Sequence, residues 1–389
     1  MMRVTQSMLY QGSLGGLQGN FQEMKSVQDQ TLSGSRLNKP SDDPASVFRD
    51  MMFSNSLEGV KSLKRTTGLA SERLALGENH ITVMHEKFLD AQDLILKLGN
   101  DVVNGTPEVL TAASREALAL YQDVLKNANA ELDGVPLFSG GKSWVPFDET
   151  QVKATDMMMR QASDSSGDLV SAPAGWQAQT DETVSEVPMS VRLTYNEANA
   201  EYEVDVNGET QTSIAVTGEN PQTLDLGNGV TVTAGDLPED GDALYFEVVP
   251  RYLGGEQDRL IKVSDDHALA GNVTGEELIE GKDPPGRGVN LFEALSGLRG
   301  ALLRADTDEI SARLAKVSEG RAQASDLQNI TGIRTKLVDS VSNTLDFDQY
   351  TIEESKAVNK EVDLFDAMSR LEQANQAMQV MTISERQIL

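Results

Sequence analysis

The chain has 389 residues, of which 39% are hydrophobic, so it is long enough to bury an apolar core and to form more than one domain. Its formal net charge of -28 disfavours contact with nucleic acid phosphates and with anionic lipid, so we expect neither nucleic acid nor membrane as a partner. The sequence contains no cysteine, which excludes disulfide bonds and thiolate metal sites.

The N-terminal residues do not resemble a cleavable signal peptide, because they carry one charge and no continuous apolar segment. No stretch of about 18 consecutive apolar residues occurs in the chain, so the sequence predicts no membrane-spanning helix. We therefore expect a soluble protein that, if it leaves the cytoplasm, uses a route without a cleavable signal.

The first amphipathic segment covers residues 14 to 32. Its apolar residues recur at alternating steps of three and four, as Leu14, Leu17, Phe21 and Met24. Glycines accompany this seam at positions 12, 15, 16 and 19. Each glycine costs about 1 kcal/mol of helix propensity relative to alanine, so we expect this segment to be helical only when it has a partner.

A second helix is expected to begin at Pro44, because Asp43 is a favourable N-cap residue and proline is favoured at the first helical position. Apolar residues then recur seven apart, as Phe53, Val60, Thr67, Leu74, Ile81, Phe88 and Ile95. This pattern predicts about 55 residues of helix in one run and a rod-like bundle.

A turn is predicted at residues 104–107, followed by a third helix whose apolar side extends from Leu110 to Leu132 and folds back antiparallel on the second. From Val135 the composition changes towards Gly, Pro, Asp and Thr. Alternating patterns predict a hairpin of residues 191–195 and 201–206, and further strands at 229–233 and 244–249.

Helical periodicity returns at Leu291 and, after Asp306, continues almost without Gly or Pro, so we expect helix to the end of the chain. The last stretch has its own apolar seam, namely Leu364, Met368, Leu371, Ala374, Met378 and Met381. Helical ends around a β-rich middle predict an α+β fold, with the terminal helices brought together in one rod.

Three parts are expected from this pattern. Residues 1–43 and 340–389 would be terminal coiled-coil helices that form an inner assembly domain. Residues 44–140 and 288–339 would form a helical bundle domain, and residues 141–287 a β-rich outer domain inserted between the helical halves.

Several stretches carry a family resemblance. They are Leu32–Ala45 (LSGSRLNKPSDDPA), Leu137–Phe147 (LFSGGKSWVPF), Leu364–Met381 and, more weakly, Gly271–Gly275. Together they resemble the flagellin-like axial proteins of the bacterial flagellum. The turn motif in the first stretch consists of Arg36, Pro40, Ser41, Asp42, Asp43 and Pro44. Pro44 and the second stretch are more similar to the subunits that join hook to filament than to filament flagellins.

The resemblance implies a secreted structural subunit at the junction of hook and filament. It implies type III export, a chaperone that holds the C-terminal helix before export, and assembly with copies of itself and with neighbouring hook-associated and filament subunits. In such proteins, the paired terminal helices order as neighbours add. The residues expected at this assembly contact are Leu14, Leu17, Phe21, Met24, Leu364, Met368, Leu371, Met378 and Met381.

Two alternatives remain open: a filament flagellin, and a secreted adhesin or enzyme whose active outer domain stands on a helical stalk. The sequence offers no catalytic, cofactor or metal site in support of an enzyme. Asp42 and Asp43 are neighbours in a proline-flanked turn, where capping is the usual role. His80 and His85 are five residues apart, so one helix face does not present both as ligands.

Overall fold

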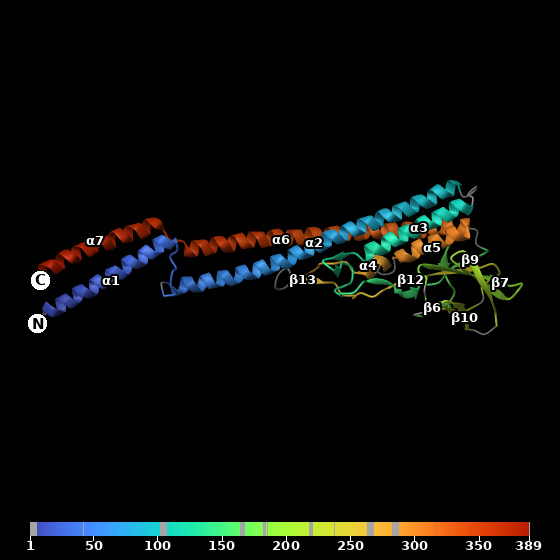
Figure 1. Ribbon diagram of the computed structural model, residues 1–389, viewed down its shortest axis with the longest axis horizontal. Helices are drawn as coiled ribbons and strands as arrows, with labels where there is room; N and C mark the ends of the chain where they lie inside the picture. Colours follow the sequence, from blue (N-terminus) through green and yellow to red (C-terminus); the bar gives the residue numbers. More distant parts are fainter. Residues whose placement is uncertain are drawn as a thin grey trace. The chain divides into compact units, whose positions relative to one another are not determined.

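The computed structural model describes residues 6–41, 43–101, 107–163, 168–181, 184, 186–217, 221–236, 238–262, 268–281 and 288–388. The chain divides into two compact units (Figure 1). Unit 1 comprises Met1–Thr66 and Val341–Leu389, and unit 2 comprises Thr67–Ser340. The long helices α2 and α6 contribute to both units.

The described residues form seven helices and fourteen strands. The helices are α1 (Gln6–Ser33), α2 (Pro44–Asp101), α3 (Pro107–Ala128), α4 (Gly275–Glu280), α5 (Leu291–Arg304), α6 (Thr307–Lys360) and α7 (Leu364–Ile388). The strands are β1 (Glu131–Leu132), β2 (Val135–Pro136), β3 (Phe147–Ala154), β4 (Met158–Arg160), β5 (Val170–Ser171), β6 (Gln177–Thr180), β7 (Met189–Asn196), β8 (Glu201–Val206), β9 (Glu209–Ala215), β10 (Gln222–Gly227), β11 (Val230–Ala234), β12 (Ala243–Tyr252), β13 (Leu260–Lys262) and β14 (Ala268–Ala270). The predicted α+β class is confirmed.

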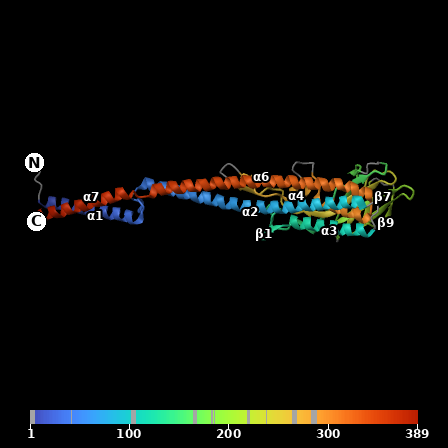
Figure 2. The ribbon, with the colours of Figure 1, turned by 90° about the horizontal axis from the view of Figure 1, so that it is seen from above.

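In unit 1, α1 and α7 lie side by side, drawn in blue and red in Figures 1 and 2. The beginning of α2 and the end of α6 form a second helix pair. Lys64 contacts Gln349, Lys356 contacts Ser54, and the Asn359 amide donates to the Ser46 carbonyl, in each case through polar atoms. Later residues of α2 contact earlier residues of α6, so this pair is antiparallel.

Helix α2 begins at Pro44, as predicted, and continues for 58 residues. Its heptad positions are buried along the part that belongs to unit 2, including Ile81 and Phe88, whose side chains are completely inaccessible to water. The seven-residue spacing therefore identified both the length of this helix and the side that packs.

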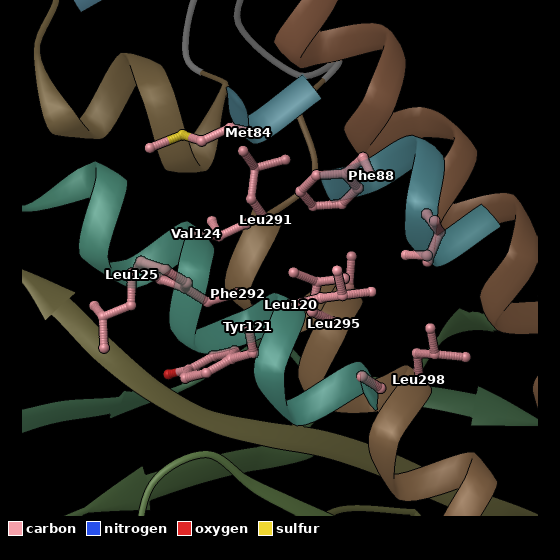
Figure 3. Packing of buried hydrophobic residues seen from close by; sticks show 14 of the residues in the cluster. Met84, Phe88, Leu120, Tyr121, Val124, Leu125, Leu291, Phe292, Leu295 and Leu298 are labelled. Carbon is pink, nitrogen blue, oxygen red and sulfur yellow. The ribbon is translucent and has the colours of Figure 1, made fainter. Parts of the chain in front are cut away.

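Helix α3 packs antiparallel on α2, since Lys87 pairs with Asp123 at 3.2 Å and His80 Nδ1 lies 2.8 Å from Asn127 Oδ1. The turn predicted before α3 lies mostly outside the described residues. Helix α5 completes the core in Figure 3 with buried side chains, among them Leu295 and Phe292, whose ring lies 5.5 Å from that of Tyr121.

The prediction that the third helix reaches Leu132 was wrong, because α3 ends at Ala128. Leu132 instead pairs with Val135 in a two-stranded ladder of β1 and β2. The turn between them is Asp133–Gly134, with φ of 53° and 74°. Asp-Gly favours this left-handed two-residue turn, so a local hairpin replaces the last predicted turn of helix.

The larger sheet of unit 2 is antiparallel, with strand order β5-β4-β12-β7-β8-β9, and β3 pairs with a further part of β12. The predicted hairpin is confirmed as β7 and β8, which pair from Val191 with Val206 to Asn196 with Glu201. The predicted strands near 229–233 and 244–249 are β11 and β12. A smaller sheet, β10-β11-β6, shares a second buried apolar cluster with the larger one.

The prediction of helix after Asp306 is confirmed for α6 and α7, except for an interruption that was not predicted, because α6 ends at Lys360 and α7 begins at Leu364. Asp363 caps the new helix, since its Oδ1 accepts from the amides of Phe365 at 2.9 Å and Asp366 at 3.2 Å. The side chain of Asp363 thus competes with continued helix at this position.

Candidate assembly interface

The predicted contact residues lie on α1 and α7, which run antiparallel within one chain. The buried centre of this pair is formed by Val27, Val362 and Ala367, with Leu371 packed against them. Towards the ends of the chain, a methyl group placed on Gly16 would lie 3.0 Å from the Met381 Cε. Gly16 therefore lies directly against the Met381 side chain of α7.

The nine predicted residues divide into two groups. Those that are partly buried between α1 and α7 are Leu17, Met24, Leu371, Met378 and Met381. Those that stay exposed are Leu14, Phe21, Leu364 and Met368, whose exposed fractions are 38%, 52%, 50% and 60% respectively. Within the chain, only two of the four predicted α1 seam residues, Leu17 and Met24, are partly buried, and Leu14 and Phe21 remain exposed.

Further apolar side chains on these two helices are exposed that the seam analysis did not select. They are Leu32, Phe365, Val380 and Ile383. Three of the α1 glycines also face open space, because a methyl group on Gly12, Gly15 or Gly19 would meet nothing within 4 Å. Helical spacing places these glycines on the opposite flank of α1 from Leu14 and Phe21, so the apolar side chains and the glycines belong to different exposed sides of the helix pair.

The turn motif closes against the break between α6 and α7. The Arg36 amide donates to the Lys360 carbonyl at 2.7 Å, and the Val362 amide donates to the Gly34 carbonyl at 3.3 Å. The Arg36 guanidinium also donates to Ser46 Oγ at 3.0 Å and to the Asn359 carbonyl at 3.3 Å. The turn motif between α1 and α2 is thus hydrogen-bonded to the residues between α6 and α7.

Asp43 caps α2, as predicted, because its Oδ1 accepts from the Ser46 amide at 3.1 Å. Ser46 Oγ donates to Asp43 Oδ2 at 2.5 Å and holds the pKa of this carboxyl below its usual value, aided by the Ser46 amide and by Arg36 at 3.4 Å. Pro40 and Ser41 are exposed, Pro44 is the first residue of α2, and Asp42 lies outside the described residues.

The Asp43→Ala variant is therefore expected to fray the first turn of α2, with amide hydrogen exchange at residues 45–48 several-fold faster than in the unmodified chain. Asp43→Asn is the matched control, since an asparagine side chain can accept the same amide hydrogen bond. Unchanged exchange in Asp43→Ala would show that this cap does not hold the helix start.

The sequence reasoning did not identify Ser46, Asn359 or Asp363 as residues of this region. Asp363 had a usable signal, because an aspartate directly before an amphipathic run is a typical helix start. The role of Asn359 had no such signal, because it depends on a contact with Ser46, more than 300 positions away.

The described part of the chain contains no group of three or more His, Cys, Asp or Glu side chains placed to hold a metal ion. Within that part, no helix is both long and apolar enough to cross a bilayer. The His80 side chain, considered above as a ligand, contacts Asn127.

Comparisons with known proteins point to one family. The bacterial flagellin N-terminal helical region matches residues 4–143. Flagellar hook-associated protein 3 of Salmonella typhimurium is 23% identical over 192 residues, which is 48% of this chain and 60% of that protein. The alignment thus spans less than two thirds of that relative's length.

Among solved structures, a candidate flagellar hook-associated protein from Vibrio parahaemolyticus aligns over 82% of this chain and 99% of its own, with 13% identity and a TM-score of 0.50. Hook-associated protein 3 from Legionella pneumophila aligns over 78% of this chain and 97% of its own, with 13% identity and a TM-score of 0.39. The resemblance found in the sequence motifs is confirmed. Residues 4–143 match the bacterial flagellin N-terminal helical region, and the chain is similar in sequence to flagellar hook-associated protein 3.

Proposed function

We propose that this chain is a structural subunit of the bacterial flagellum that joins hook to filament, and that it assembles through the exposed side of its terminal helices. One observation supports this most. Of the 23 exposed large hydrophobic side chains among the described residues, fourteen lie in unit 1, which holds only 115 of the 389 residues. Such a concentration of exposed large hydrophobic side chains is typical of a protein interaction site.

The partners in this proposal are copies of the chain and the adjoining hook-associated and filament subunits, in a secreted assembly. An export chaperone would cover α7 before secretion, because Phe365 is 89% exposed and Val380 65% exposed on that helix. The work of the protein would be mechanical connection and not catalysis.

Immunoelectron microscopy with antibodies against unit 2 tests the location. Label confined to a short segment between hook and filament is the expected result. Label along the whole filament would favour the filament flagellin, and no label on the flagellum would favour the secreted adhesin or enzyme.

The Phe21→Asp/Met368→Asp variant is expected to stop incorporation into the flagellum, because it places two charges on the open side of the α1–α7 pair. Both side chains are more than half exposed, so the variant keeps the chain's internal packing. Swimming and the amount of protein in sheared flagella are measured in cells that lack the unmodified chain.

Leu260→Asp is the control for this experiment, since Leu260 is 67% exposed but lies on β13 of unit 2. This control variant is expected to incorporate normally. Normal incorporation of the Phe21→Asp/Met368→Asp variant would contradict the proposed role of the terminal helices.

A further inference from the structure

Unit 1 has a second exposed apolar surface, which lies on α2 and is separate from the α1–α7 pair. Phe48, Met51 and Met52 are 64%, 61% and 54% exposed. Their spacing of three and four residues places them on one side of the helix. Ser46 and Ser54, which contact α6, lie on the other side. We name Phe48, Met51 and Met52 the methionine face.

A third exposed apolar surface lies on the other helix of this antiparallel pair, near the end of α6. Phe347, Tyr350 and Val358 are 69%, 64% and 70% exposed. Val358 is three helical turns beyond Phe347, so these side chains also share one side. Gln349 and Lys356 contact α2 from the opposite side of α6. We name Phe347, Tyr350 and Val358 the aromatic face.

The two faces are complementary in apolar chemistry. Methionine side chains are flexible and polarisable, and their sulfur atoms make favourable contacts with aromatic rings. One face supplies two methionines and the other supplies two aromatic rings. Neither face covers the other within one chain, because both groups stay more than half exposed.

The two faces are also complementary in charge. Residues 44–66 of α2 contain four basic and two acidic side chains, and Arg49 and Arg65 are exposed among them. Arg65 is fourteen residues from Met51 and therefore lies on the side of the methionine face. Residues 341–361 contain five acidic and two basic side chains, and Asp348 and Glu354 are exposed among them. Opposite charges around two apolar surfaces favour their contact and set its orientation.

We infer that the methionine face of one copy packs against the aromatic face of the next copy. This inference rests on the proposed assembly function and identifies a contact that does not involve the nine residues of α1 and α7. Because one chain carries both complementary halves, the occupant that fits each face best is a second copy. A contact between two different faces repeats from copy to copy, which produces rings or helical arrays and not closed dimers.

Disulfide trapping in isolated flagella tests this contact directly, because the chain has no cysteine of its own. The Met52→Cys/Tyr350→Cys variant is expected to give a ladder of disulfide-linked multimers after oxidation. Met52→Cys alone and Tyr350→Cys alone are expected to stay monomeric on non-reducing gels. Met52→Cys/Ile333→Cys is a matched control, since Ile333 is 66% exposed on α6 but lies outside the aromatic face.

Incorporation is measured first under reducing conditions, so that a defect in assembly is not confused with a missing contact. If Met52→Cys/Tyr350→Cys fails to incorporate, Met51→Cys/Phe347→Cys replaces it. An incorporated variant without multimers would overturn the inference and leave the proposed function intact. Dimers from either single-cysteine variant would also overturn it, because they would show contact between identical faces.

Charge reversal provides an independent test of the contact between the two faces. Arg65→Glu and Asp348→Lys/Glu354→Lys are each expected to lower incorporation at least several-fold when expressed alone. Expression of both variants together is expected to restore it, because each altered face then meets an oppositely charged face on the other chain. Failure of the mixture to restore incorporation, with both chains folded, would contradict the contact.

Discussion

The Arg313→Met variant is expected to unfold with a free energy about 3 to 5 kcal/mol lower than the unmodified chain, because it leaves a buried carboxylate without its partner. Arg313 lies on α6, and its Nη2 donates to Oε1 of Glu247 on β12 at 2.7 Å. Neither side chain has any accessible surface. This ion pair joins the larger sheet to the helices of unit 2.

The surroundings of Arg313 explain the expected size of this loss. Glu309 lies 3.6 Å from Arg313 and 2.6 Å from Arg304, and Arg304 also pairs with Asp205 on β8 at 3.1 Å. Burial raises the pKa of Glu247, while the guanidinium groups of Arg313 and Arg304 act in the opposite direction. Without Arg313, the ionised form of Glu247 becomes still less favourable.

Urea unfolding followed by tryptophan fluorescence measures this change, because both tryptophans, Trp144 and Trp176, belong to unit 2. Lys316→Met is the control on the same helix, since Lys316 and Glu319 are a more exposed pair 3.8 Å apart, and its expected effect is below about 1 kcal/mol. Arg313→Met/Glu247→Leu is expected to recover most of the loss by removing the unpaired charge. Equal stability of Arg313→Met and Lys316→Met would contradict the role of the buried pair.

The parts of the fold that could be predicted are those set by local periodicity. The start of α2 follows from Asp43 and Pro44, and its buried side follows from the seven-residue spacing. The β7–β8 hairpin likewise follows from two alternating runs around a short polar turn. These signals lie within a few residues of the structure that they specify.

The division of the terminal seams could not be predicted in the same way. Leu14 and Leu17 have the same apolar character, yet only Leu17 is partly buried on the α7 side. Which side of α1 meets α7 depends on the interruption at residues 361–363, where the turn motif of residues 34–46 is hydrogen-bonded. The heptad pattern therefore identified helices that bury apolar surface, but not which surface each partner covers.

The burial of the charged residues around Arg313 could not be predicted from the sequence either. Glu309 and Arg313 are four residues apart on α6, a spacing that is typical of an exposed helical ion pair. Their burial depends on β12 and on Gly297 of α5, where an added methyl group would lie 2.3 Å from Arg313 Nη1. Only tertiary packing distinguishes this pair from the solvated charges elsewhere on the helix.

Raising the pH from 5 to 8 is expected to lower the free energy of unfolding of unit 2 by about 3 kcal/mol through Glu293 alone. Burial raises the pKa of this α5 carboxyl from 4.5 to about 8, and Glu247 acts in the same direction, while Arg313 and Lys316 oppose it. Between these two pKa values the folded chain keeps a proton that the unfolded chain releases. Stability is therefore highest at the acidic end of this window and falls as the pH rises.

Glu293→Gln isolates this contribution, because it keeps the shape of the side chain and removes its titration. The difference in unfolding free energy between the unmodified chain and this variant is measured by urea unfolding at several pH values, again through tryptophan fluorescence. Glu277, whose pKa burial also raises, is present in both proteins and does not affect the difference in first order. Glu247 is coupled to Glu293, so the difference reports the two carboxyls as an interacting pair. A difference that stays constant from pH 5 to 8 would mean that Glu293 ionises in the folded chain as freely as in the unfolded one. A difference that changes with the expected sign would show that the Glu293 carboxyl stays protonated in the folded chain across this pH range.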